Sequence, residues 1–500
     1  MTTNQRPNIV WIMSDHMPYV HHKRLTGYPT LPTYDRIAEE GIAFNNAYSV
    51  CPLCQPARAS MLTGAYPHKH GMLLNDGHLG VRRDFEPDER LFNAYLHDEG
   101  YRTGYFGKWH AGIERIAKDY GFEGFSCPSY GHPYWSEEYE QYLEEQGLPS
   151  AEVTIEWWIA NPQWAGRTIR LSDFPKPYEF PHLLMESCGV LNTPVETHEA
   201  YFLAHLATSW LEDVAESGEP FCLRVDPWGP HHPFWVGEPF LDTVDPHDLP
   251  QYPSFGNELR HRPQSHQDLL ASRKGWSTWR TWDEFRWFLA RGHEHSHLVD
   301  AAMGQVVETL DRLGLADNTI VIYTVDHGGA LATNGLLVDK GWVMSDETVR
   351  IPLAIRWPDH IRPGSQTDAL VTNMDLVATT LDAAQAASPD DMDSRSLLDL
   401  VQRPDDTEWR EDLMIQHHGH YSQLRIQRQI RYGQYKYNAH LDDLDELYDL
   451  TQDPYELDNL IDHPDMQSVL ADMRQRLKRQ MEMHGDDAPE ALRLLRECGL

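Results

Sequence analysis

The chain has 500 residues, and its 77 Asp and Glu against 42 Lys and Arg give a formal net charge of −35. This acidic excess argues against nucleic acid and anionic membranes as partners, and any site for an anionic substrate must be a local positive pocket. Six scattered cysteines make no disulfide framework, and no apolar run is long enough to span a bilayer. Because the N-terminal residues lead into an apolar strand without a signal segment, we expect a cytoplasmic location.

The first predicted element is a short apolar strand over residues 8–13, with the sequence Asn-Ile-Val-Trp-Ile-Met. It is followed by Asp15 and His16. Open α/β sheets bind ligands at the carboxyl ends of their strands, so Asp15 is a candidate ligand-binding residue. An ordinary turn carboxylate is the alternative interpretation.

The most specific pattern in the chain starts at Cys54 and reads C-x-P-x-R-x-x-x-L-T-G. Pro56 suits the first turn of a helix and Gly64 its C-terminal end, so Cys54 is predicted to lie at a helix N-terminus, which attracts anions. Arg58, one turn on, can reach the same spot. Cys51 and Cys54 also form a C-x-x-C, so a redox pair or a plain helix with buried cysteines are the alternatives.

A second dense pattern runs from Gly100 to His110 and reads G-Y-x-T-x-x-x-G-K-x-H. Lys108 and His110 lie two residues apart, so on an extended segment both face the same side. A lysine can bind an anionic oxygen, and a histidine can transfer a proton. Surface polar residues on a strand are the alternative. Between the two patterns lies Asn75, which precedes Asp-Gly in a polar loop. An ordinary turn is the alternative interpretation of this residue.

Two further apolar strands are predicted at residues 221–225 and 319–324. The first leads to a P-H-x-P-F segment containing His231, which could protonate a leaving group. The second ends at Asp326 and His327, which stand directly after a strand as Asp15 does.

Residues 293–297 match H-E-x-x-H, the zinc-protease pattern, on a predicted helix. Zinc there needs a third ligand, which Asp311 or Asp317 could supply. With 28 histidines in the chain, however, a chance match is expected.

The segment starting at Cys54 resembles the signature of the sulfatase family, in which this cysteine is oxidised to formylglycine. The other segments follow in family order from residue 8 to about 460, including Lys340 and then E-x-x-R-I-P-L from Glu347. His16 stands where many sulfatases carry a second Asp, which resembles the branch of choline sulfatases and phosphonate monoester hydrolases.

This resemblance implies an alkaline-phosphatase-like α/β fold. Residues 1–405 would form the catalytic domain, with a large, mostly parallel central sheet flanked by helices. Residues 406–500 would form a smaller C-terminal α+β domain with an antiparallel sheet, a helix from about 466 to 483, and a tail. The amphipathic tail around residues 491–496 could dock on a neighbouring subunit, giving a homo-oligomer.

The resemblance also implies the reaction, hydrolysis of a sulfate ester to an alcohol and inorganic sulfate by a metal-bound formylglycine hydrate. The implied catalytic residues are Cys54, Arg58, Lys108, His110, His231 and Lys340. The implied substrate-binding residues are Asn75, Lys108, His231 and Lys340, and the implied metal ligands are Asp15, Cys54, Asp326 and His327. The cofactors would be one divalent ion, Mn²⁺ or Ca²⁺, and the formylglycine, which requires a formylglycine-generating enzyme as partner.

Within this scheme, His231 would protonate the departing alcohol, His110 would deprotonate the remaining hydroxyl, and Arg58 would hold the formylglycine in place. Lys108 and His110 favour sulfate esters, because phosphonate hydrolases vary at these positions. The nearest alternative is a phosphonate monoester or phosphodiester hydrolase with the same nucleophile. Two alternatives belong to other classes of protein. One is a zinc protease, and the other is a non-catalytic binding protein on a sulfatase scaffold. The alcohol could be a carbohydrate, an aryl or a small alkyl group.

Overall fold

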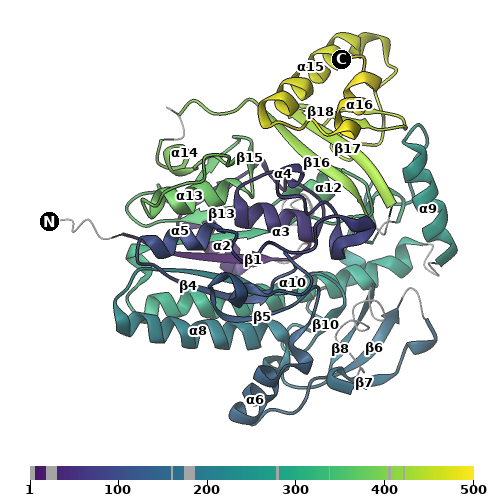
Figure 1. The fold of residues 1–500 in the computed structure, drawn as a ribbon. Helices are drawn as coiled ribbons and strands as arrows, with labels where there is room; N and C mark the ends of the chain where they lie inside the picture. The colour runs from purple at the N-terminus through teal and green to yellow at the C-terminus, as the bar shows by residue number, and fades with distance from the viewer. Residues whose placement is uncertain are drawn as a thin grey trace.

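The computed structural model describes residues 6–17, 31–158, 162–173, 186–276, 281–336, 338–403, 407–420 and 423–500. An eight-stranded sheet with the order β14-β2-β13-β11-β1-β9-β4-β5 lies at its centre (Figure 1). Its strands are β1 (Asn8–Ser14), β2 (Ile42–Phe44), β4 (Arg102–Lys108), β5 (Glu123–Cys127), β9 (Phe221–Asp226), β11 (Thr319–Val325), β13 (Leu353–Arg356) and β14 (Ser365–Thr367). The run from β11 to β5 is parallel throughout, and β13 is antiparallel to β11, which confirms the mostly parallel sheet.

Helices cover both faces of this sheet, which explains why strands such as β1 are buried at every residue and read as continuous apolar runs. On one side lie α8 (Glu199–Ser217) and α10 (Trp282–Arg312), and α2 (Pro32–Glu39) packs against α10. On the other side lie α3 (Cys54–Thr63), α5 (Phe92–Asp98) and α13 (Asp375–Ala383), as Figure 1 shows.

The register of the parallel strands brings their carboxyl ends together at one edge. Ser14 at the end of β1 pairs with Val325 at the end of β11, and Gly107 near the end of β4 pairs with Asp226 at the end of β9. The polar residues that follow these strands therefore leave the sheet side by side, as expected for a ligand site in an open α/β sheet.

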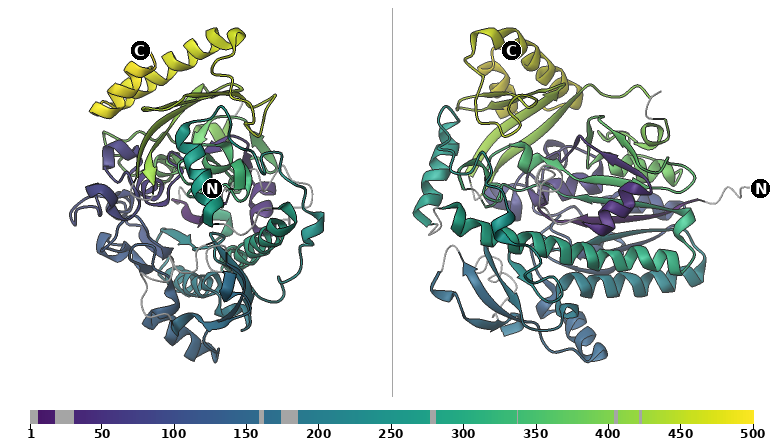
Figure 2. Two further views of the ribbon diagram at one scale, coloured as in Figure 1. Left: turned by 90° about the vertical axis from the view of Figure 1, so that its right-hand side faces the viewer. Right: turned by 180° about the vertical axis from the view of Figure 1, so that it is seen from behind.

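A separate antiparallel sheet near the C-terminus consists of β16 (Asp412–His420), β17 (Gln423–Tyr432), β18 (Tyr435–His440) and β19 (Glu446–Asp449). It is covered by α15 (Gln467–His484) and α16 (Pro489–Glu497), as the two views of Figure 2 show. The sheet and the helix predicted at 466–483 are confirmed, whereas the domain boundary at 405/406 stays a prediction.

The amphipathic tail forms α16, and its apolar side is covered within the same chain. Ala491 and Leu494 are fully buried in one apolar cluster with Tyr437 of β18 and Leu477 of α15. The tail therefore needs no neighbouring subunit to cover its apolar side, and the homo-oligomer stays a prediction.

The remaining elements are smaller. Two minor sheets consist of β6 (Glu152–Trp158), β7 (Thr168–Arg170), β8 (Ser187–Leu191) and β10 (Phe234–Val236), and of β3 (Ala47–Tyr48), β12 (Arg350–Ile351) and β15 (Val371–Thr372). The other helices are α4 (Pro67–His70), α6 (Glu137–Gln146), α9 (Gln264–Trp276), α11 (Thr333–Leu336), α12 (Asp346–Val349) and α14 (Leu398–Gln402). Among the described residues, no helix has the length and apolar character to cross a membrane.

Candidate active site

Helix α3 begins at Cys54, as the sequence pattern predicts. Leu53 before it is extended, and Gly64 ends the helix with a left-handed φ of 70° while its N–H donates to the Ser60 carbonyl. The Sγ atom of Cys54 lies 3.0 Å from Nε2 of His327 and 3.5 Å from Nζ of Lys340. Three residues predicted from separate segments thus meet at the start of one buried helix.

The surroundings of Cys54 are cationic, despite the acidic sequence. Burial raises the pKa of the Cys54 thiol, but Lys108, Lys340 and His327 together outweigh burial and hold the pKa well below its usual value. Because the whole chain has a net charge of −35, an anionic substrate requires a local positive pocket, and the surroundings of Cys54 form such a pocket.

The four predicted metal ligands, Asp15, Cys54, Asp326 and His327, form one buried group, in which one ligand atom from each lies within 4.8 Å of the others. Oδ1 of Asp15 is buried and makes no hydrogen bond to any described residue. Nδ1 of His327 donates to the Gly328 carbonyl at 2.6 Å, so in the neutral ring Nε2 presents a lone pair to the group. This donor set fits a hard or borderline divalent cation.

Arg58, one turn after Cys54 in α3, is held by hydrogen bonds to carboxylates and to a backbone carbonyl. Its side chain is fully buried; Nε donates to Oδ2 of Asp326 at 2.8 Å and Nη1 donates to the Lys108 carbonyl at 2.7 Å. Nη1 also contacts Oδ2 of Asp226 at 3.3 Å, and that carboxylate is shared with Arg224 at 2.8 Å. Arg58 therefore fixes Asp326 and the end of β4 relative to α3.

Lys108 and His110 both lie at the site, but not on one extended segment as expected, because β4 ends at Lys108 and His110 has a φ of 39°. The ammonium of Lys108 is ion-paired with Asp15 and lies 4.0 Å from the ring centre of Tyr130. Nε2 of His110 is 3.6 Å from Oδ1 of Asp76. Burial lowers the pKa of His110, but Asp76 and Cys54 together raise it above its ordinary value.

His231 and Lys340 form a pair on the other side of Cys54. Nδ1 of His231 donates to the His232 carbonyl at 2.7 Å, and its Nε2 lies 3.4 Å from Nζ of Lys340. Lys340 is also 3.1 Å from Oδ1 of Asp339. Burial, then His232 and Lys340, hold the pKa of His231 well below its usual value, so Lys340 carries the proton of this pair.

Asn75 also lies beside the helix start. Its Oδ1 accepts a hydrogen bond of 3.0 Å from the backbone N–H of Gln55, the second residue of α3. The side chain thereby satisfies one of the free donors at the helix N-terminus. The weak sequence indication for Asn75 thus corresponds to a residue in contact with the segment that carries Cys54.

Three polar residues around the site were not singled out from the sequence: Asp76, Tyr130 and Asp339. Asp76 belongs to an Asn-Asp-Gly turn, and Tyr130 and Asp339 lie in segments without periodicity. Asp226, which also contacts Arg58, follows the strand predicted at residues 221–225, and that position is the sequence signal for a place in the site.

The zinc-protease interpretation of residues 293–297 is wrong. These residues lie in α10, where Glu294 accepts from Arg291 at 2.7 Å and from the backbone N–H of Val244 at 3.2 Å. Nε2 of His295 lies 3.1 Å from Nε2 of His198. Within the described part of the chain, His293 and His297 belong to no group of potential metal ligands.

Comparison with known proteins agrees with this geometry. The family model described as sulfatase matches residues 7–386, and the model described as N-sulphoglucosamine sulphohydrolase, C-terminal, matches residues 335–483. The chain belongs to the sulfatase family and is a sulfuric ester hydrolase.

Individual relatives are distant but extend over most of the chain. An ulvan-active sulfatase of Formosa agariphila is 26% identical, covering 96% of this chain and 82% of the relative. The choline-sulfatase of Rhizobium meliloti is 25% identical, covering 93% and 84%. The solved phosphonate monoester hydrolase of Silicibacter pomeroyi has a TM-score of 0.74 at 21% identity, covering 96% of this chain and 95% of that one, which shows the shared fold.

Proposed function

We propose that Cys54 is the residue oxidised to formylglycine and that the hydrate formed there supplies the oxygen that attacks sulfur. The observation that supports this is the position of Cys54 Sγ, 3.0 Å from Nε2 of His327 and 3.5 Å from Nζ of Lys340 at the start of a helix. The Sγ atom of the unmodified Cys54 lies where the reactive oxygen of the formylglycine hydrate would lie. A formylglycine-generating enzyme is the partner required for the modification.

Asp15, Asp326, His327 and position 54 would hold one divalent cation, Mn²⁺ or Ca²⁺. Such an ion would supply positive charge that favours the ionised nucleophile and the sulfate oxygens. The orphaned Oδ1 of Asp15 and the Nε2 lone pair of His327 support this assignment.

The two lysines of the site would bind the sulfate group. Lys108 lies on the Asp15 side of Cys54, and Lys340 lies on the His231 side. Their ammonium groups would therefore flank the sulfur atom of a bound sulfate ester. Charges fixed in this way stabilise the developing charge of the transition state without reorganisation. Arg58 would hold Asp326, and Asn75 would hold the helix start beside the substrate.

His231 and Lys340 together would deliver a proton to the departing oxygen. Nε2 of His231 faces the protonated Lys340, and the negative charge of a bound sulfate ester favours a protonated imidazole. His110, next to Asp76, would take the proton from the remaining hydroxyl so that sulfate leaves. The substrate would be the sulfate ester of a carbohydrate or of a small alcohol, as the relatives suggest. A cytoplasmic location stays a prediction.

A matched pair of esters tests the reaction class. We expect kcat/KM to be at least about tenfold higher for a nitrophenyl sulfate than for the corresponding phosphonate monoester, because the two lysines match the sulfate group. The protein must first be shown to carry formylglycine by the mass of the peptide containing position 54. A preference for the phosphonate in modified protein would establish the alternative, a phosphonate monoester or phosphodiester hydrolase.

Replacing His231 with alanine should slow substrates with poor leaving groups most. We expect kcat on an alkyl sulfate to fall about 10²–10³-fold, because its alkoxide needs a proton, while a nitrophenyl sulfate loses much less. Steady-state kinetics on a series of esters with increasing leaving-group pKa measures this difference.

The substitution His266→Gln is the matched control, since His266 is equally buried but lies beside Glu446, at 3.9 Å, and outside the two groups of residues around Cys54. It should leave the leaving-group dependence unchanged. If His231→Ala lowered kcat equally for all esters, His231 would not be the proton donor to the leaving group.

A further inference from the structure

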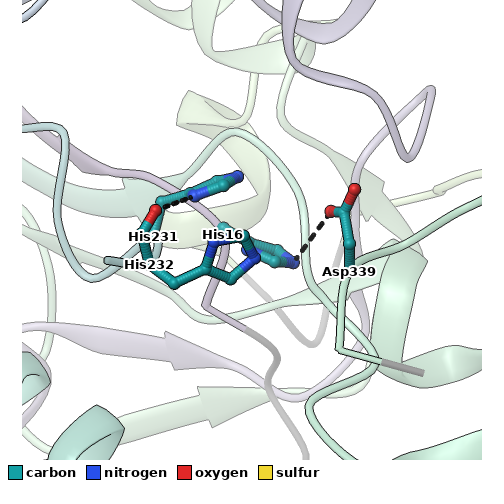
Figure 3. A group of neighbouring side chains, drawn as sticks. All are labelled: His16, His231, His232 and Asp339. Atoms are coloured by element: carbon teal, nitrogen blue, oxygen red, sulfur yellow. Dashed lines mark hydrogen bonds and ion pairs between the residues drawn. The ribbon is translucent and has the colours of Figure 1, made fainter. Parts of the chain in front are cut away.

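A second group of potential metal ligands lies directly beside the first. His16, His231, His232 and Asp339 come from the ends of β1 and β9 and from the loop before α12, and Figure 3 shows their side chains converging. All four are buried, and one ligand atom of each lies within 4.8 Å of the others. None of the three histidines is among the ligands assigned to the first ion.

His16 points into this second group although it follows Asp15 directly in sequence. Its Nε2 is 3.8 Å from Oδ1 of Asp339, and its ring centre is 4.5 Å from that of His231. Nε2 is buried and makes no hydrogen bond to a described residue. A buried imidazole nitrogen without such a bond is costly unless another group satisfies it.

The backbone around His16 is adapted to this orientation. His16 has a φ of 63°, a left-handed conformation that non-glycine residues adopt at some cost in energy. A Cβ at Gly329 would lie only 1.8 Å from Nε2 of His16, so only glycine at 329 admits the ring. The left-handed backbone of His16 and the space that Gly329 leaves together determine the position of the His16 imidazole.

We propose that His16, His231 and Asp339 bind a second divalent cation, of which zinc is the best match. Two imidazoles and one carboxylate with a fourth position open is a usual ligand set for zinc, whereas Ca²⁺ prefers oxygen ligands. Because Nδ1 of His231 donates to a carbonyl, its Nε2 has the lone pair that a metal requires.

His232 is the weakest candidate of the four. Its Nδ1 accepts the backbone N–H of Glu186 at 3.1 Å, so the proton of the neutral ring is on Nε2 and that atom has no lone pair for a metal. We therefore assign three protein ligands and leave His232 outside the set.

The third group in the described chain, His266, His440 and Glu446, is less suited to a metal. The Glu446 carboxylate already accepts from Arg262 at 3.1 Å and from the Tyr448 hydroxyl at 2.7 Å, and also from Asn438 and His440. Its charge is thus neutralised and its oxygens are occupied, so this group serves as an internal comparison.

A cation at the second site would interfere with the reaction rather than assist it. Nζ of Lys340 lies 3.4 Å from Nε2 of His231 and 3.1 Å from Oδ1 of Asp339, so the ammonium and a metal would compete for these two ligand atoms. A metal-bound Nε2 cannot carry a proton to a leaving group. This consequence rests on the proposed function, but occupancy of the site does not.

Zinc stoichiometry tests the proposal independently of turnover. Full-length protein is stripped with a chelator, dialysed against ZnCl₂, and its zinc content is measured by elemental analysis and by calorimetric titration. We expect two equivalents for the wild type and one each for His16→Asn and Asp339→Asn, where asparagine tolerates the left-handed backbone of position 16. Asp15→Asn should lose the other equivalent, and His266→Gln, the matched control, should keep both.

One equivalent in the wild type, or two in both folded variants His16→Asn and Asp339→Asn, would overturn the proposal. Circular dichroism establishes that each variant is folded. As a second readout, zinc that fills the site should lower kcat/KM of the wild type more than about tenfold on an alkyl sulfate, because proton donation by His231 is lost. If two equivalents bind but zinc does not inhibit, the second site stands and the proton-donor role of His231 is what fails.

Discussion

Replacing Cys54 with alanine is expected to abolish turnover of sulfate esters, with a fall in kcat of at least about 10⁴-fold. Alanine cannot be oxidised to formylglycine, and the substitution removes the Sγ atom that contacts both His327 and Lys340. The lysines and the other three proposed metal ligands would remain, so substrate could still bind. The measurement is single-turnover and steady-state hydrolysis of a nitrophenyl sulfate by the folded variant.

Cys51→Ala is the matched control, because Cys51 lies three residues earlier, is equally buried, and shares the C-x-x-C with Cys54. Burial raises the pKa of both thiols, but Cys51 lacks Lys108, Lys340 and His327, so its pKa stays above the usual value while that of Cys54 is held below it. We expect Cys51→Ala to keep activity. Equal inactivation by both substitutions would indicate a redox pair instead.

The mass of the peptide carrying position 54 decides what an inactive preparation means. Oxidation to formylglycine removes the sulfur and two hydrogens and adds one oxygen. If the wild type is active while its Cys54 is unmodified, the nucleophile is a thiol and the proposed chemistry is wrong. If Cys54 is unmodified and the protein is inactive, the host lacks the modifying enzyme.

Much of this site could be predicted because its residues follow strands or occur in dense motifs. Asp15 and Asp326 each come directly after an apolar run, and parallel strands bring such positions to one edge. Cys54 and Arg58 lie on one turn of a helix whose ends are marked by Pro56 and Gly64. In these cases local sequence determines the position of the side chain.

The contacts between segments could not be predicted in the same way. The ion pair of Lys108 with Asp15 depends on the order of strands in the sheet, in which β9 stands between β4 and β1. The orientation of His16 depends on the space above Gly329, more than 300 residues away in sequence. Neither the strand order nor a close approach of this kind is encoded in periodicity, so the second group of ligands emerged only from the structure.

Replacing Arg58 with methionine is expected to lower the free energy of unfolding by about 3–5 kcal/mol, because it leaves buried carboxylates without their cation. Arg58 is fully buried between Asp326 at 2.8 Å and Asp226 at 3.3 Å, and methionine fills much of the volume without the charge. Urea denaturation of the wild type and the variant, both stripped of metal, measures the difference. Arg312→Met, which breaks an exposed pair with Glu212, should change stability by less than about 1 kcal/mol.

Added metal should reduce the effect of Arg58→Met, and this distinguishes a structural role from a role at the metal site. A divalent cation held by Asp15 and Asp326 would replace part of the positive charge that Asp326 loses with Arg58, whereas Asp226 still has Arg224 at 2.8 Å. The destabilisation should therefore be smaller in the presence of saturating Mn²⁺ than after chelation. If the two values are equal, the metal does not bind at Asp326, and the assignment of the first metal site would have to be withdrawn.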